Sequence, residues 1–196
     1  IAVYDVATQE LVERILDIEE PETFDLHPNG KILYVSNEED AMVSFVDLET
    51  GEVVKEVEVG EEPEGVLVMP DGSIVFVTSE NANMVHVIDT KTGEVLADIL
   101  VGTRPRRFAL TPNGKELWVS AELAGSVNII DTALLKVTDE LLFRPQGFRK
   151  DEVTPVDVLI TRDGKTAFVA LGRANHVAVV DVASKKVKDY LLVGKR

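Results

Sequence analysis

Apolar and polar residues alternate along most of the chain in short runs that are separated by turns. In "VSFVD" and "VHVID", for example, apolar side chains occupy alternate positions ahead of an aspartate, and the intervening turns read "HPNG", "MPDG", "TPNG" and "TRDG". A period of two places alternate side chains on opposite faces of an extended segment, and Pro, Asn, Asp and Gly are the residues that tight turns favour. The pattern therefore predicts an all-β protein of short antiparallel strands.

This pattern repeats at a fixed distance along the chain. The turn glycines are spaced 42, 42 and 50 residues apart, at Gly30, Gly72, Gly114 and Gly164. The aspartates are spaced 42, 42, 42 and 50, at Asp5, Asp47, Asp89, Asp131 and Asp181. The prolines that begin each unit give 42, 42 and 50, at Pro21, Pro63, Pro105 and Pro155. An insertion between Phe143 and Pro155 explains the longer interval.

Each repeat contains four predicted strands. In the second complete unit they are residues 64–69, 74–79, 84–89 and 94–101. Four short antiparallel strands in about 40 residues are typical of one β-propeller blade. A two-sheet sandwich is the alternative, but a sandwich does not require its turns to recur at a strict interval. We therefore expect a single β-propeller domain.

The repeat divides the chain into a half blade, four complete blades and an inserted loop. The half blade is residues 1–18, the insertion is 144–154, and the complete blades are 19–60, 61–102, 103–143 and 155–196. An open arc of blades leaves apolar faces and strand edges unpaired. We therefore expect a longer, seven-bladed ring with roughly two and a half further blades. A partial propeller that is completed by self-association is the alternative.

Charge and composition narrow the classes of function. The formal net charge is −15, which argues against nucleic-acid binding because most of the surface would repel a phosphate backbone. No run approaches the roughly 18 apolar residues of a membrane helix, so we expect no membrane insertion. Cysteine is absent, which excludes thiolate chemistry and disulfide bonds.

Longer stretches of the sequence carry a family resemblance. The runs "YVSN", "FVTS", "WVSA" and "FVAL" resemble the YVTN-type propeller repeat. The stretches "TSENANMVHVIDT", "RPRRFALTPNGKELWVSAE" and "TRDGKTAFVALGRANHVAVVD" are similar to the PQQ-dependent catabolism-associated β-propeller proteins, and this similarity covers essentially the whole chain. The resemblance implies a seven-bladed, periplasmic or otherwise extracytoplasmic protein that accompanies quinoprotein alcohol metabolism. No cofactor is evident from the residues, so an association with PQQ is implied by the resemblance alone.

The three histidines do not converge in the predicted register. His27, His86 and His176 fall in different layers of different blades, so a shared three-histidine metal site is not expected. We assign His27 to a solvated turn and His86 to a structural polar position. His176 begins a third strand near a loop and is the one histidine that could face a pocket.

Other residues that suggest chemistry have structural interpretations. Trp118 occupies a repeat position that is otherwise filled by Tyr34, Phe76 and Phe168, so we place it in the core. The repeated aspartate precedes a turn, where a carboxylate accepts local backbone N–H bonds. We find no nucleophile–histidine–acid spacing, phosphate-binding glycine loop or zinc motif, and "SNEED" lacks the ligand spacing of a calcium loop.

The candidate site lies where the repeat is interrupted. In a propeller, the loops that join the fourth strand to the next blade and those between the second and third strands meet on one face, around the channel mouth; we call it the loop face. The candidate binding residues there are Arg104, Arg106, Arg107, Glu80, Glu122, Arg144, Arg149, Arg173, Asn175 and His176, with Lys150 beside Arg149. Clustered guanidinium groups recognise carboxylates. Alternatively, these arginines pair with nearby glutamates and hold the blade junctions together.

The sequence favours a non-enzymatic β-propeller that binds an anionic small molecule or a protein partner at the loop face, as an accessory to PQQ-linked alcohol catabolism by resemblance. One alternative is a propeller enzyme of lactonase or lyase type, or a protein that handles a quinone cofactor at the channel mouth. Another is a passive scaffold whose blade sides contact the partner. No catalytic residue and no metal ligand is assigned.

Overall fold

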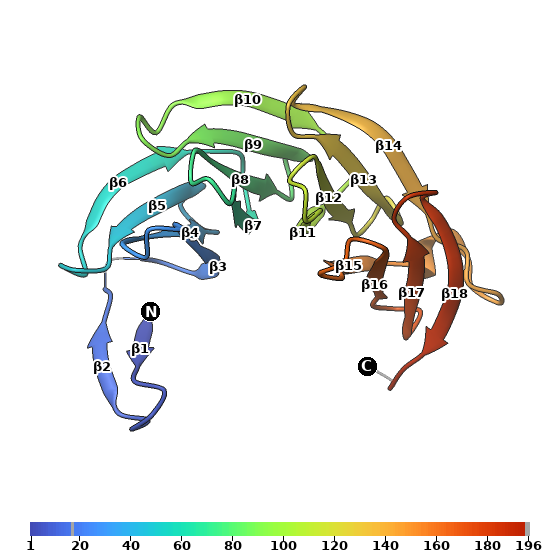
Figure 1. The fold of residues 1–196 in the computed structure, drawn as a ribbon, viewed down its shortest axis with the longest axis horizontal. Helices are drawn as coiled ribbons and strands as arrows, with labels where there is room; N and C mark the ends of the chain where they lie inside the picture. The colour runs from blue at the N-terminus through green and yellow to red at the C-terminus, as the bar shows by residue number, and fades with distance from the viewer. Residues whose placement is uncertain (17, 195–196) are drawn as a thin grey trace.

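The computed structural model describes residues 1–16 and 18–194. Over these residues the chain forms β-strands in five antiparallel sheets, and the one helical element is the 3-10 turn η1 (Lys150–Glu152). The sheets follow one another in sequence order around an open arc (Figure 1). None of the described residues belongs to a helix long and apolar enough to cross a membrane.

The sheets are the predicted half blade and four complete blades. The half blade pairs β1 (Ala2–Tyr4) with β2 (Leu11–Arg14). The first two complete blades contain β3 (Pro21–Leu26), β4 (Ile32–Asn37), β5 (Met42–Asp47), β6 (Val53–Glu58), β7 (Pro63–Val68), β8 (Ile74–Ser79), β9 (Met84–Asp89) and β10 (Val95–Leu100). The last two contain β11 (Pro105–Leu110), β12 (Glu116–Ala121), β13 (Ser126–Asp131), β14 (Lys136–Leu142), β15 (Pro155–Ile160), β16 (Thr166–Leu171), β17 (His176–Asp181) and β18 (Lys186–Leu192).

Within each complete blade the four strands pair in sequence order, and the first strand lies on the concave side of the arc (Figure 1). Thus β3, β7, β11 and β15 face the region that would be the channel, and β6, β10, β14 and β18 form the outer rim. The propeller architecture with four complete blades and a partial one is therefore confirmed.

Neighbouring blades pack face to face, and the repeat determines which side chains meet. Tyr34 and Phe45 of one blade lie in the same core cluster as Val66 and Val77 of the next. Phe76 and Trp118 occupy the position of Tyr34 in the following blades, and both are fully buried. Full burial of one large apolar side chain stabilises the fold by about 1.5–3 kcal/mol, so each junction gains a substantial contribution from this position.

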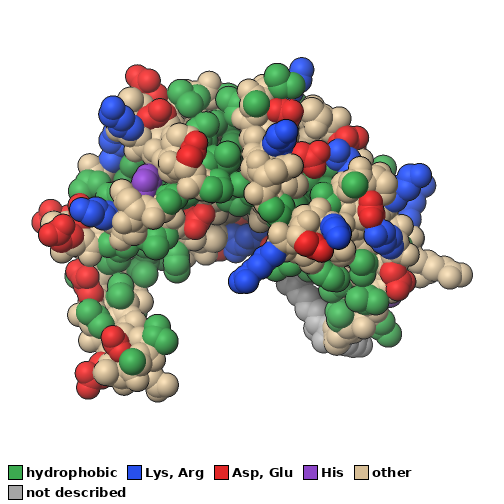
Figure 2. Space-filling model, viewed as in Figure 1, with side chains coloured by type: hydrophobic (Ala, Val, Ile, Leu, Met, Phe, Trp, Pro, Cys, Tyr) green, Lys and Arg blue, Asp and Glu red, His purple; other side chains and the backbone are tan. Residues whose placement is uncertain are grey.

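The last blade shows the same positions without a following sheet. Phe168 and Val179 are only partly buried there, and Leu159 is 59% exposed. At the other end of the arc, Phe24 and Leu26 of β3 are 56% and 46% exposed, because the half blade supplies only two strands. The aromatic side chain at this repeat position is therefore buried in the first three complete blades and only partly buried in the fourth. Figure 2 shows hydrophobic side chains on the surface at both ends of the arc.

The repeated aspartate has the structural role that the sequence predicts. Asp89 Oδ1 accepts hydrogen bonds from the backbone N–H groups of Lys91 at 2.9 Å and Thr92 at 2.7 Å. These bonds, with one from the Thr92 hydroxyl, hold the pKa of the Asp89 carboxyl below its usual value. The other repeats use the same turn, so these carboxylates are engaged locally.

Candidate binding sites at the loop face

Two groups of residues on the loop face contain clustered cations. The first, which we call the mouth cluster, is formed by Arg104, Arg106, Arg107, Glu64, Glu80 and Glu122. The second, the insertion site, is lined by Gly125, Leu142, Phe143, Arg144, Phe148, Arg149, Lys150 and Val153. Arg104, Glu80 and Glu122 lie in loops, as the sequence predicts, but Arg106 and Arg107 belong to the first strand β11 rather than to the loop before it, and Glu64 belongs to β7. The insertion site lies where the loop after β14 meets the loop between β12 and β13.

Arg106 is the centre of the mouth cluster. Its Nη2 lies 3.0 Å from Glu64 Oε1, and its Nη1 lies 3.2 Å from Glu122 Oε2. Nη1 also forms an ion pair with Glu80 Oε1 at 2.6 Å, although the N–H is not oriented for a hydrogen bond to that oxygen. The exposed fraction is 4% for Glu64, 3% for Glu80 and 8% for Glu122, so one guanidinium is surrounded by three buried carboxylates.

The other two arginines complete the charge balance. Arg104 Nε lies 2.5 Å from Glu80 Oε2 and 3.5 Å from Glu122 Oε2. Arg107 Nη2 lies 2.9 Å from Glu64 Oε1, and Nη1 donates to the Glu64 carbonyl at 3.2 Å and to the Thr23 hydroxyl. The cluster therefore joins β3, β7 and β11 with three positive and three negative charges.

Burial and pairing oppose each other in the titration of this cluster. Burial raises the pKa of Glu64, and the charges of Arg107 and Arg106 only partly offset that rise. Burial acts to lower the pKa of Arg104, but the hydrogen bond that Arg104 donates to Glu80 and the charges of Glu80 and Glu122 raise it overall. Because a buried charge without a partner is costly, each set of charges needs the other.

The first complete blade shows what happens without arginine. Glu22 and Glu38 occupy the repeat positions of Arg106 and Glu122. A hydrogen bond between the two carboxyl groups, together with partial burial and their mutual repulsion, raises the pKa of Glu38 to about 7. Two carboxylates at close range share a proton when no cation separates them.

The structure thus brings together five of the residues that the sequence singles out, and it realises the alternative in which the arginines pair with glutamates. Glu64 was missed in the sequence analysis. A signal for it exists, because Glu64 and Arg106 hold the same repeat position in neighbouring blades and must be adjacent around the channel. Each guanidinium of the mouth cluster already has a carboxylate partner, so the cluster is suited to holding blades together.

The insertion site is built on a well-anchored loop. The Arg144 backbone N–H donates to Tyr190 Oη at 2.7 Å, and Val153 is 2% exposed in the core between the last two blades. Arg149 N–H donates to Glu152 Oε2 at 2.8 Å and closes η1. Gly125 adopts a φ of +69°, and a Cβ there would lie 3.3 Å from Val153 O, so this glycine lets the loops approach.

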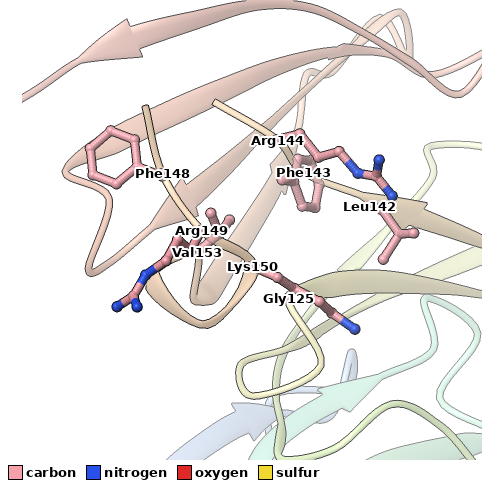
Figure 3. A pocket seen from close by; sticks show the side chains of 8 residues that line it. All are labelled: Gly125, Leu142, Phe143, Arg144, Phe148, Arg149, Lys150 and Val153. Carbon is pink, nitrogen blue, oxygen red and sulfur yellow. The ribbon is translucent and has the colours of Figure 1, made fainter. Parts of the chain in front are cut away.

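The cations of the insertion site differ in their partners. Arg149 is 76% exposed and lies 3.5 Å from Asp151 and 3.4 Å from Glu152. Among the described residues, no carboxylate lies within ion-pair distance of Arg144 or Lys150. In Figure 3 the Arg144 and Lys150 side chains extend to the same side of the site with Leu142 between them, whereas Arg149 extends to the opposite side.

Three further candidates are close in sequence: Arg173 and Asn175 lie in the loop between β16 and β17, and His176 begins β17 beside the insertion site. The His176 ring packs edge-on to Phe148 at a centroid distance of 5.4 Å, and its Nδ1–H donates to Ala174 O at 2.6 Å. The backbone N–H of Arg173 donates to Thr154 Oγ1 at 2.8 Å, and Asn175 has a φ of +53°. His176 therefore orients a wall of the insertion site, while the other two shape the adjoining turn.

Three residues in the second blade resemble a hydrolase triad in space. His86 Nε2 lies 2.9 Å from Ser79 Oγ, and Nδ1 lies 2.6 Å from Asp98 Oδ1. However, Nε2 accepts the Gly60 N–H at 3.0 Å, Ser79 Oγ donates to Gly60 O at 3.0 Å, and Ser79 is fully buried. The arrangement ties a loop to strands β9 and β10, which confirms the structural role predicted for His86 and leaves the serine closed to substrates.

The remaining predicted features are found in their places. Trp118 is fully buried, and its Nε1–H donates to Glu116 Oε2 at 3.2 Å. His27 lies in its turn and accepts the Asn29 N–H at 3.1 Å, but its ring also covers Gly72 of the next blade. Among the described residues, no group of histidine, aspartate and glutamate side chains is arranged to hold a metal ion.

Comparisons with known proteins show the fold and no closer relationship. No protein-family model matches the chain, and the search of curated proteins found no match. The hydrazine synthase of Kuenenia stuttgartiensis is similar with a TM-score of 0.82 and 26% identity, over 93% of this chain and 51% of that one. The β-propeller domain of Cps50 (Swd1) from Myceliophteria thermophila has a TM-score of 0.80 and 12% identity, over 93% and 58%.

A third similar structure is the dihydro-heme d1 dehydrogenase NirN in complex with DHE, with a TM-score of 0.75 and 17% identity, over 95% of this chain and 40% of that one. The chain therefore spans about half the length of these solved structures. All three are β-propeller proteins, and some are enzymes by name. The chain is thus similar in structure to β-propellers of diverse function.

Proposed function

We propose that this β-propeller is a non-enzymatic binding protein that takes an anionic small molecule or an acidic protein segment at its loop face. One observation carries the proposal. Arg144 and Lys150 line a cavity of about 220 Å³ without a carboxylate partner among the described residues, whereas the arginines of the mouth cluster are neutralised. An anion that enters the insertion site would therefore meet two cations, Arg144 and Lys150, that have no ion-pair partner in the part of the chain that the structure describes.

The surrounding chemistry supports this assignment. The formal net charge of the chain is −15, so an anion is repelled by most of the surface and attracted only where cations dominate locally. A guanidinium recognises carboxylate or phosphate oxygens through two parallel N–H bonds. The anchoring of the insertion loop by Tyr190 and by the core holds these groups in place before the ligand arrives.

The cellular setting is a finer part of the proposal. The YVTN-like runs and the similarity to PQQ-associated propellers support an extracytoplasmic accessory role in quinoprotein alcohol catabolism. A seven-bladed ring would place the insertion site at the rim of a complete loop face. Loss of growth on alcohols after deletion of the gene, restored by the wild-type gene, would support that role, and unchanged growth would contradict it.

Anion binding tests the proposal directly. Acetate, benzoate, inorganic phosphate and a poly-glutamate peptide are titrated into the wild-type protein and into the double variant Arg144→Met, Lys150→Met. We expect at least one probe to bind and to lose about tenfold or more in affinity in the variant, because charge-assisted hydrogen bonds are lost.

A matched control removes the same two charges elsewhere. Arg162 and Lys186 are exposed on the opposite face of the last blade, so Arg162→Met, Lys186→Met changes the net charge equally. Equal losses in the two double variants would mean that only overall charge matters, and absence of binding for every probe would likewise overturn the proposal.

A further inference from the structure

We infer that the ligand of the insertion site is a small aromatic carboxylate, with a single ring and one acidic group. The inference rests on the proposed function, because it names the ligand class for that same site. It is drawn from the size of the cavity, its apolar lining and the position of Arg144 and Lys150, which have no ion-pair partner among the described residues.

The cavity is small. Its volume of about 220 Å³ is below the roughly 300–1,000 Å³ of pockets that hold drug-sized ligands. A ligand of one ring with a short acidic substituent suits this space, whereas a folded protein surface would contact only its rim. The size therefore favours a small molecule over the acidic protein segment.

The apolar wall favours an aromatic ring over an aliphatic chain. Phe148 and Leu142 are 36% and 45% exposed and lie at opposite ends of the site in the view of Figure 3, whereas Phe143, drawn between them, is 3% exposed. Packing against His176 fixes the ring of Phe148. Aromatic rings attract one another at centroid distances of roughly 4.5–7 Å beyond the gain from buried area, so an oriented Phe148 can select a second ring.

The charged end follows from the directions of the side chains. Arg144 and Lys150 extend to the same side of the site, with Leu142 between them in the view of Figure 3. One carboxylate held at this side would meet the planar fork of Arg144 and the compact ammonium of Lys150. Arg149 extends away and is already close to Asp151 and Glu152, so it is not needed for this contact.

Four probes separate the two halves of the ligand. Benzoate has both the ring and the charge, acetate has only the charge, benzyl alcohol has only the ring with a neutral hydroxyl, and inorganic phosphate has charge without a ring. We expect benzoate to bind about tenfold more tightly than the other three, as measured by calorimetry and by NMR shifts of the Phe148 and His176 rings.

Substitution of the wall gives a second, independent test. We expect Phe148→Ala to weaken benzoate by roughly fivefold or more and to leave phosphate binding unchanged, and Phe148→Leu to keep the apolar wall but lose part of the ring preference. Phe24, which is 56% exposed on β3, provides the matched control variant Phe24→Ala, with no expected change.

The outcomes distinguish this inference from the function on which it rests. If acetate or phosphate binds as tightly as benzoate, or if Phe148→Ala changes nothing, the inference is overturned while anion binding at Arg144 and Lys150 stands. If no probe depends on those two cations, both are overturned.

Discussion

The mouth cluster and the insertion site both contain cationic side chains, but these cations are paired with buried carboxylates only in the mouth cluster. In the mouth cluster, three arginines meet three carboxylates that are less than one-tenth exposed. In the insertion site, Arg144 and Lys150 have no such partner among the described residues. A cluster of cations on an acidic protein therefore indicates a binding site only when neighbouring carboxylates do not already neutralise it.

The comparison also separates stability from binding. Removing one partner of a buried ion pair leaves an uncompensated charge, whereas removing an exposed unpaired cation leaves the fold almost unaffected. Changes in the mouth cluster should therefore alter the free energy of unfolding, and changes in the insertion site should alter ligand affinity.

The largest expected effect is that of Arg106→Met. It leaves Glu64, Glu80 and Glu122 around an apolar side chain, and we expect a loss of about 3–5 kcal/mol in the free energy of unfolding. Urea denaturation followed by circular dichroism measures the loss, and Arg106→Lys should lose less because one charge remains. A loss below about 1 kcal/mol would show that the cluster is not a structural element.

The second prediction is that acid relieves this defect. Burial already raises the pKa of Glu64 above its usual 4.5, and without Arg106 the rise is larger. A carboxyl with a raised pKa holds its proton in the folded state at a pH where the unfolded chain has lost it, so stability increases as the pH falls from 7 towards 4.5. We expect the gap between Arg106→Met and wild type to narrow at pH 5; a constant gap would contradict this account.

The third prediction concerns the insertion site and is smaller in stability. Arg144→Met, Lys150→Met should change the free energy of unfolding by no more than about 0.5 kcal/mol per substitution, because neither side chain has an ion-pair partner in the described chain. The same denaturation experiment measures it. A loss comparable to that of Arg106→Met would remove the distinction between the two groups.

The fourth prediction concerns the arginine-free first blade. Glu22→Gln removes the charge of the partner carboxylate, so the pKa of Glu38 should fall from about 7 towards 4.5. In the wild type this raised pKa lowers stability as the pH rises from about 4.5 to 7, and the variant should show a flatter dependence. NMR titration of the Glu38 carboxyl checks the shift, and an unchanged titration near pH 7 would mean that another group causes it.

The fold could be predicted from the sequence because the same blade motif is repeated along the chain. A strand assignment that is ambiguous in one repeat can be checked against the same position in the other repeats. Runs of alternating apolar residues between glycine turns also specify strands without reference to distant residues. The repeat position that Tyr34, Phe76 and Trp118 share was assigned to the core in the same way. Phe168 shows the limit, because its burial depends on whether another sheet lies against it.

The sequence indicated where to look for a candidate site, but it did not show how the charged residues there are paired. Loop-face residues were identified because the repeat is broken there, but their charge state depends on neighbours one blade away. Glu64 and Arg106 meet across a junction, and His86 finds Ser79 and Asp98 across its own blade, where sequence spacing gives no catalytic pattern. The apolar wall formed by Phe148 depends on how an irregular loop folds back onto His176.

The sequence by itself therefore determined the all-β class, the blade repeat and the structural turn aspartates. These are local or periodic properties, which depend on backbone geometry and on alternation of apolar side chains. Only the tertiary structure decided which cations are neutralised and which face a cavity. Electrostatic pairing and burial act over distances of a few ångströms between residues far apart in the chain, and those distances exist only in the folded protein.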